Sequence, residues 1–159
     1  MSDSLFAPMF TSPEIRQVVS SESWVEAMLE AEAALARALV SCGVISLDAS
    51  AAIGEICGAG GFDLQAIAHA AVAAGNPVIP LVDAIRARVP SEYASAVHRG
   101  ATSQDMLDTA MMLILRRALD LILADLDGIA AATARLVRQH RTTLMPGRTL
   151  MQQAVPITF

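Results

Sequence analysis

The sequence predicts an all-α fold, and three observations support that prediction. Hydrophobic residues make up 54% of the 159 residues and aromatic residues only 4%, and much of the apolar fraction is alanine, which favours helix and fits tight contacts between helices. Several apolar runs with spacings of three and four follow a serine or an aspartate suited to a helix N-cap. No alternating strand pattern bounded by hairpin turns is evident. The length is compatible with one domain that has a core of its own.

Five helices are predicted ahead of residue 90. Ser12 as N-cap and Pro13 at the first helical position open a short helix that ends near Ser20. A longer helix begins at Ser21 or Ser23, packs one apolar face and stops at Gly43. The other three are expected from Ser46 or Asp48 to the glycine cluster at 58–61, from Asp63 to Ala74, and from Pro77 to Val89.

One very long helix is predicted from about Ser103 to about Arg141. Gly128 is the only glycine or proline in this stretch, and apolar residues keep helical spacing along it. Such a helix would be on the order of 55 Å long. Its apolar stripe needs long partner helices, as in a bundle, and this sequence supplies none of matching length. The partners must therefore come from other subunits or from further chain.

Composition and charge exclude several classes of function. The net charge is −5, which leaves no positive surplus for a nucleic-acid partner. No lysine occurs, which excludes a lysine Schiff base and a P-loop within these residues. The apolar run 110–124 is interrupted by Arg116, Arg117 and Asp120, so it does not suit a membrane span.

The cysteines and the first residues predict an ordinary cytoplasmic protein. Cys42 and Cys57 form neither a CxxC pair nor part of a metal-ligand cluster, and both are expected to be buried free thiols. The start at Met1–Ser4 is acidic and leads to no apolar core, so no secretory signal is expected.

The most informative segment runs His98-Arg99-Gly100-Ala101-Thr102-Ser103-Gln104-Asp105. It suits an anion site where a loop becomes a helix. Gly100 permits close backbone approach, and Thr102 and Ser103 offer hydroxyl and N–H groups at the positive end of a helix dipole. The alternative is an ordinary helix start, with Thr102 or Ser103 as N-cap and Asp105 as a first-turn acid. Helix physics alone favours that alternative.

A second segment follows the predicted long helix. After the loop expected at 143–146, the chain reads Gly147-Arg148-Thr149-Leu150-Met151-Gln152-Gln153-Ala154-Val155-Pro156-Ile157-Thr158-Phe159. The two ordered motifs, joined by a helix of suitable length, resemble those of the fumarase/aspartase superfamily. The GATSQD form of the first motif, the segment 75–82 and the segment 29–37 resemble its carboxymuconate cycloisomerase branch. Leu150 stands where the lyases of the superfamily carry a histidine, and leucine cannot transfer a proton.

The resemblance implies a cofactor-independent, metal-free cycloisomerase that lactonizes 3-carboxy-cis,cis-muconate in protocatechuate (β-ketoadipate) degradation. It implies an N-terminal helical domain at 1–100 and the start of a central helical bundle at 101–159. It also implies a homotetramer whose sites are shared between subunits. The serine-bearing loop that holds the proposed base in the family does not occur in this sequence. We therefore expect an N-terminal fragment of the enzyme, inactive by itself.

The resemblance also implies the site residues. We expect His98 to donate a proton or a hydrogen bond to a polycarboxylate substrate, and Asp105 to position the loop. The expected substrate-binding residues are Thr102, Ser103, Gln104, Arg148, Thr149 and Gln152. Two alternatives remain open: a fragment of a superfamily lyase such as adenylosuccinate lyase, and a non-catalytic helical oligomerisation module.

Overall fold

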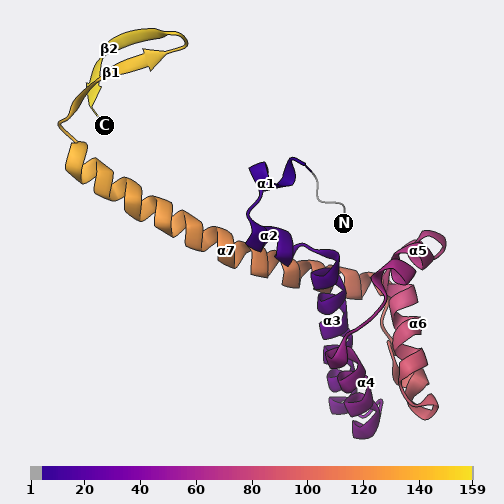
Figure 1. Cartoon of the computed structure of the whole chain (residues 1–159). Coiled ribbons are helices and arrows are strands. Elements are labelled where there is room, and N and C mark those ends of the chain that lie inside the picture. Colours follow the sequence, from indigo (N-terminus) through magenta and orange to yellow (C-terminus); the bar gives the residue numbers. More distant parts are fainter. Residues whose placement is uncertain (1–4, 159) are drawn as a thin grey trace. The chain divides into compact units, whose positions relative to one another are not determined.

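The computed structural model describes residues 5–158 and is helical over most of that range (Figure 1). The predictions made for Met1–Ser4 and for Phe159 lie outside the described residues. The all-α fold class is confirmed, with one small two-stranded sheet as the β structure among residues 5–158. The elements in order are α1 Ala7–Phe10, α2 Pro13–Val18, α3 Ser21–Ser41, α4 Leu47–Ala59, α5 Leu64–Ala74, α6 Val78–Arg88, the 3-10 helix η1 Ser91–Ala96, α7 Ser103–His140, β1 Leu144–Thr149 and β2 Gln152–Thr158.

Side-chain caps fix where most of these helices begin. The hydroxyl oxygens of Ser12, Ser20 and Ser46 accept hydrogen bonds from the backbone N–H groups of Ile15, Ser23 and Ala49. The Asp63 carboxylate accepts from two N–H groups of α5. These bonds satisfy donors that have no partner within the helix. The predicted helix ranges are confirmed to within a few residues, whereas α1 and η1 are too short to show a period and were not predicted.

The chain divides into two compact units, Met1–Ala118 and Leu119–Phe159, and α7 runs through the boundary. In the first unit α3 lies beside α4, and α5 lies beside α6 (Figure 1). Its largest fully buried side chains are Met28, Ile53, Leu81, Ile85, Glu32, Val78 and Val97. The first turns of α7 add Met106, Ala110 and Ile114 to the same core. The predicted boundary between 100 and 101 stays a prediction.

The second unit contains a hairpin that the sequence analysis missed. The segment 143–146 was predicted to be a loop, and no strand was expected, yet Leu144–Thr149 pairs antiparallel with Gln152–Thr158. Thr149 pairs with Gln152 around a two-residue turn, and the register shifts between Pro146 and Arg148. A Cβ on Gly147 would lie 2.8 Å from the carbonyl oxygen of Val155. Pro146, Pro156 and this bulge break the alternation by which strands are recognised.

An apolar seam runs along the rest of α7. We define it as Met112, Leu115, Leu119, Ile122, Leu126, Ile129 and Leu136. Successive members are three, four or seven residues apart, the spacing of core positions in left-handed helix packing. Each is between 39% and 61% exposed. The expectation of a long helix with an uncovered stripe is therefore confirmed.

Two further findings concern membrane spans and thiols. Among residues 5–158 no single helix is long and apolar enough to cross a membrane, and α4 and α5 meet that test only together, across a bend of 114°. Both cysteines are free, but only Cys57 is buried. The prediction that Cys42 is buried is wrong, because Cys42 follows the last turn of α3 on the surface.

Candidate functional site

The loop before α7 is held by two hydrogen bonds between Thr102 and Asp105. Gly100 has φ 77°, a conformation suited to glycine, and α7 begins two residues after Ala101. The backbone N–H of Thr102 donates to the Asp105 carboxylate at 2.9 Å, and the N–H of Asp105 donates to the Thr102 carbonyl at 2.9 Å. The Asp105 carboxylate thus satisfies the N–H of Thr102, as in one half of a capping box, while the Asp105 N–H bonds to the Thr102 carbonyl and not to its hydroxyl. The predicted positioning role of Asp105 is confirmed, and the Thr102 N–H is occupied.

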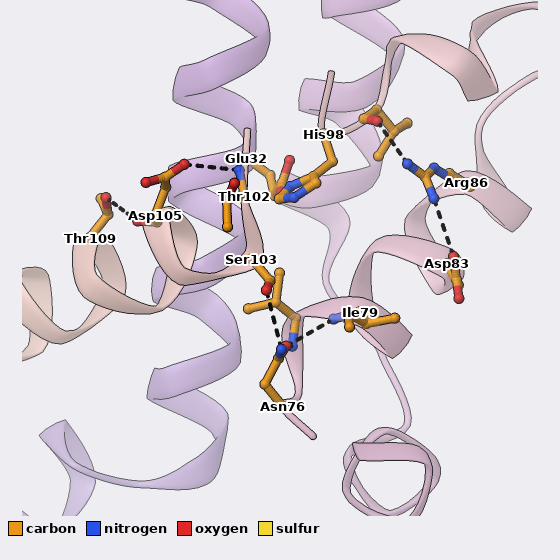
Figure 2. A network of polar contacts seen from close by, with 12 residues as sticks. Glu32, Asn76, Ile79, Asp83, Arg86, His98, Thr102, Ser103, Asp105 and Thr109 are labelled. Carbon is orange, nitrogen blue, oxygen red and sulfur yellow. Dashed lines mark hydrogen bonds and ion pairs between the residues drawn. The ribbon is translucent and has the colours of Figure 1, made fainter. Parts of the chain in front are cut away.

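Asn76 joins the N-termini of α6 and α7. Its Oδ1 accepts from the N–H groups of Val78 at 3.0 Å and Ile79 at 3.3 Å, which caps α6. Its Nδ2 donates to the Ser103 hydroxyl at 3.2 Å (Figure 2). Two positive helix ends are thus tied together by one side chain, an arrangement that favours negative charge beside them.

His98 is bound to an acid from a distant helix. Its Nδ1 lies 2.5 Å from Oε1 of Glu32 on α3 (Figure 2). The two side chains are only 13% and 1% exposed. His98 has φ 58°, a left-handed backbone that residues other than glycine seldom adopt and that is found at functional sites.

Burial dominates the electrostatics around Glu32. Removal from water raises the pKa of the Glu32 carboxyl, and the hydrogen bond and charge of His98 and the charge of Arg86 act in the opposite direction. Arg86 donates to the Val97 carbonyl and to Asp83. Burial, reinforced by Glu32, raises the pKa of the Cys57 thiol to about 12, so that the thiol is neutral at physiological pH.

A small hollow of about 100 Å³ lies where these groups meet. It is lined by Val78, Ile79, Val82, Asp83, Arg86, His98 and Ser103. An imidazole, a guanidinium and a hydroxyl line a space beside two helix N-termini, and groups of these kinds can bind a carboxylate. The carboxylate of Asp83, which pairs with Arg86, lines the same space. Among residues 5–158 no group of three or more His, Cys, Asp or Glu side chains is placed to hold a metal ion.

The structure gathers the predicted site residues into two sets. His98 and Ser103 line the hollow, while Thr102 is exposed beside it and Gln104 donates to Asp108 at 2.7 Å on the exposed face of α7. In the second unit, Arg148 and Thr149 of β1 and Gln152 of β2 lie at the turn end of the hairpin, around an open hollow of about 530 Å³. Leu150 is 89% exposed in that turn.

The sequence analysis did not identify three residues of the candidate site: Glu32, Asn76 and Arg86. The sequence does contain a sign of the role of Glu32, because an acidic residue beside the apolar stripe of α3 indicates a buried carboxyl group with a partner. Asn76 carried a weaker signal, since an asparagine two residues ahead of a helix is a common cap. Arg86 carried none, because its bond to the Val97 carbonyl and its electrostatic effect on Glu32 depend on tertiary packing, and its pairing with Asp83 is an ordinary contact within a helix.

Fold and site together define a helical protein with a small, partly polar hollow at the start of a long helix. The chain matches the lyase family over residues 9–159 and belongs to that family. It is 48% identical to nitrosuccinate lyase of Streptomyces davaonensis, over 98% of this chain and 33% of that protein. It is 46% identical to 3-carboxy-cis,cis-muconate cycloisomerase of Bradyrhizobium diazoefficiens, over 98% of this chain and 35% of that protein.

The solved structures agree with this assignment. The crystal structure of 3-carboxy-cis,cis-muconate lactonizing enzyme from Pseudomonas putida superposes with a TM-score of 0.91 at 43% identity, over 97% of this chain and 36% of that one. The predicted resemblance to cycloisomerases of the fumarase/aspartase superfamily is therefore confirmed. The chain spans about a third of the length of the curated relatives it matches.

Proposed function

We propose that this chain forms part of a cofactor-independent cycloisomerase that lactonizes 3-carboxy-cis,cis-muconate. The observation that supports a carboxylate-bearing substrate is the hollow lined by Arg86, His98 and Ser103. Its donors come from three chain segments, and Glu32 and Asn76 hold His98 and Ser103 in place. Donors fixed before a ligand arrives need no reorganisation when negative charge develops, and that is how they lower a barrier.

The most demanding part of the reaction is the stabilisation of negative charge on its intermediate. A carboxylate oxygen adds to a double bond, a five-membered lactone closes, and a proton goes to the carbon beside another carboxylate. Before that proton arrives, the intermediate carries two negative charges on one carboxyl group. We assign carboxylate binding to Thr102 and Ser103 and hydrogen-bond donation to His98. On the hairpin we assign contacts to Thr149 and Gln152 and charge pairing to Arg148; Gln104 stays a candidate contact.

Leu150 favours the cycloisomerase over a lyase that needs a histidine at this position. Leucine has no titratable group, so any proton transfer must use other residues. A second candidate has support of its own, because the nitrosuccinate lyase of S. davaonensis is 48% identical to this chain. In that case the same hollow would hold a carboxylate of a nitrosuccinate-type substrate. A non-catalytic helical module stays the third possibility.

We also propose that the apolar seam of α7 is covered by further helices, in a homotetramer of the whole protein. The 3-4 spacing of seven large exposed side chains supports this assembly. Sedimentation equilibrium of the whole protein should give four times the subunit mass. A monomer at micromolar concentration would contradict it. The expected cytoplasmic location and the lack of nucleic-acid and membrane partners stay predictions.

The activity is tested on a protein of the relatives' length that carries this chain. Ultraviolet absorbance of 3-carboxy-cis,cis-muconate is followed with the protein, and nitrosuccinate and adenylosuccinate are offered in parallel. We expect loss of the carboxymuconate absorbance, and at least a tenfold lower kcat/KM after Ser103→Ala, equivalent to about 1.4 kcal/mol. Turnover of nitrosuccinate alone would favour the second candidate. The 159-residue chain by itself is expected to show no turnover.

A further inference from the structure

The contact between Glu32 and His98 leaves one polar atom without a partner. Oε1 of Glu32 is 2.5 Å from Nδ1 of His98, whereas Oε2 is buried and has no hydrogen-bond partner among the described residues. A buried carboxylate oxygen with no donor is costly when it carries charge. The cost falls when the carboxyl group shares a proton, because the charge on Oε2 then falls too.

Counting protons defines the state of the pair. With two protons in total, either Glu32 is ionised and His98 is an imidazolium, or Glu32 is neutral and donates to Nδ1 of a neutral imidazole. The two forms differ only in the position of the proton between Oε1 and Nδ1, and both are neutral overall. With one proton, the pair carries a net buried negative charge. The orphaned Oε2 disfavours that last form.

The neutral pair has a consequence for the ligand. In both of its forms the second proton of His98 is on Nε2, because Nδ1 is engaged with Glu32. His98 lines the hollow together with Arg86 and Ser103. We propose that Glu32 is the positioning residue of this site: it holds a proton against Nδ1 of His98, so that His98 presents Nε2–H as a fixed hydrogen-bond donor to a carboxylate group of the ligand.

The groups around the pair are compatible with this arrangement. The charge of Arg86 on α6 acts on Glu32, and the guanidinium also pairs with Asp83, so its positive charge is partly neutralised. From α4, Cys57 contributes a neutral thiol. The left-handed backbone of His98 orients the ring toward α3. The identity of the ligand as a carboxylate rests on the proposed function, whereas the proton position does not.

The test is nitrogen NMR of the 159-residue chain labelled in its three histidines, His69, His98 and His140. Assignment uses His69→Gln and His140→Gln, and spectra are recorded at about pH 8, above the usual histidine pKa of about 6.5. We expect Nε2 of His98 to carry a proton and Nδ1 to show the intermediate shift of a shared proton. A carboxamide cannot share a proton, so Glu32→Gln should move the Nδ1 signal.

A matched control is Glu30→Gln, which removes the same charge from an exposed position of the same helix, where Glu30 pairs with Arg117. It should leave the His98 signals unchanged. A bare Nε2 beside a fully protonated Nδ1 in the unsubstituted chain would overturn the proposal, as would identical His98 signals after Glu32→Gln. The protonation of Nε2 and Nδ1 is measured on the unsubstituted chain, so this outcome tests the proposal even where Glu32→Gln prevents folding. Failure of the carboxymuconate assay with the expected NMR result would overturn only the proposed substrate.

Discussion

The two ends of α7 differ in how far their apolar side chains are buried. Met106, Ala110 and Ile114 are at most 6% exposed in the core of the first unit, whereas Leu126 and Ile129 are 52% and 61% exposed. The difference cannot arise from helix propensity, because both ends belong to one continuous helix of 38 residues. It arises from what the rest of the chain supplies around each end.

The polar groups follow the same division. In the first unit they form a network that links α3, α6 and the start of α7 through Glu32, His98, Asn76 and Ser103. In the second unit the hairpin is defined by its strand ladder and by the close approach at Gly147. Side-chain hydrogen bonds between distant elements therefore organise the first unit, whereas backbone pairing organises the hairpin of the second.

The largest expected effect tests whether the first unit has a real core. Leu81→Ala removes a side chain with no exposed surface and should lower the free energy of unfolding by about 2–5 kcal/mol. Leu126→Ala, on the exposed seam, should change it by less than about 0.5 kcal/mol at low protein concentration. Urea unfolding followed by circular dichroism measures both. Equal losses would contradict the division between the two ends.

The next effect concerns the hairpin. Gly147→Ala places a Cβ 2.8 Å from the Val155 carbonyl oxygen and should destabilise the hairpin by roughly 1–3 kcal/mol. Gly128→Ala is the control, because a Cβ there meets nothing within 4 Å and alanine stabilises a helix by up to about 1 kcal/mol. Amide exchange of β1 and β2 is the measurement. An undisturbed hairpin in Gly147→Ala would show that the close approach is not required.

A smaller effect is expected at the bridge between α6 and α7. Asn76→Ala removes a cap and the bond to Ser103, at a cost of about 0.5–2 kcal/mol. Ser46→Ala removes a single cap bond in α4 and should cost less. A double-mutant cycle with Ser103→Ala isolates the bridge. Strict additivity in that cycle would mean that Asn76 acts only as a cap.

The smallest effect is a pH dependence from Glu32. Its pKa in the folded state is raised above its ordinary value of 4.5, so its contribution to stability is complete below that value and is lost as pH rises through the folded-state pKa. The free energy of unfolding should therefore fall above about pH 4.5, by at most about 1.4 kcal/mol per pH unit for one group. Urea midpoints across pH should show this fall in Glu30→Gln and a reduced fall in Glu32→Gln. The same slope in both variants would assign the effect to another group.

Local features of the sequence predicted the helices and half of the site. Ser12, Ser46 and Asp63 cap helices that begin where the sequence places them, because capping depends on a few neighbouring residues. His98 and Ser103 were found through a motif. Their partners Glu32 and Asn76 lie 66 and 27 residues away along the chain, and no local pattern specifies such pairings. The hairpin was missed because two prolines and a bulge hide its alternation.

The central claim is that the first unit is stable by itself while the seam of α7 needs additional helices. Amide hydrogen exchange of the 159-residue chain, measured at several protein concentrations, tests it most directly. At the lowest concentration the amides of 106–114 should exchange at least about tenfold more slowly than those of 126–137, a difference of about 1.4 kcal/mol in opening free energy. Equal protection of the two stretches at that concentration would contradict the claim.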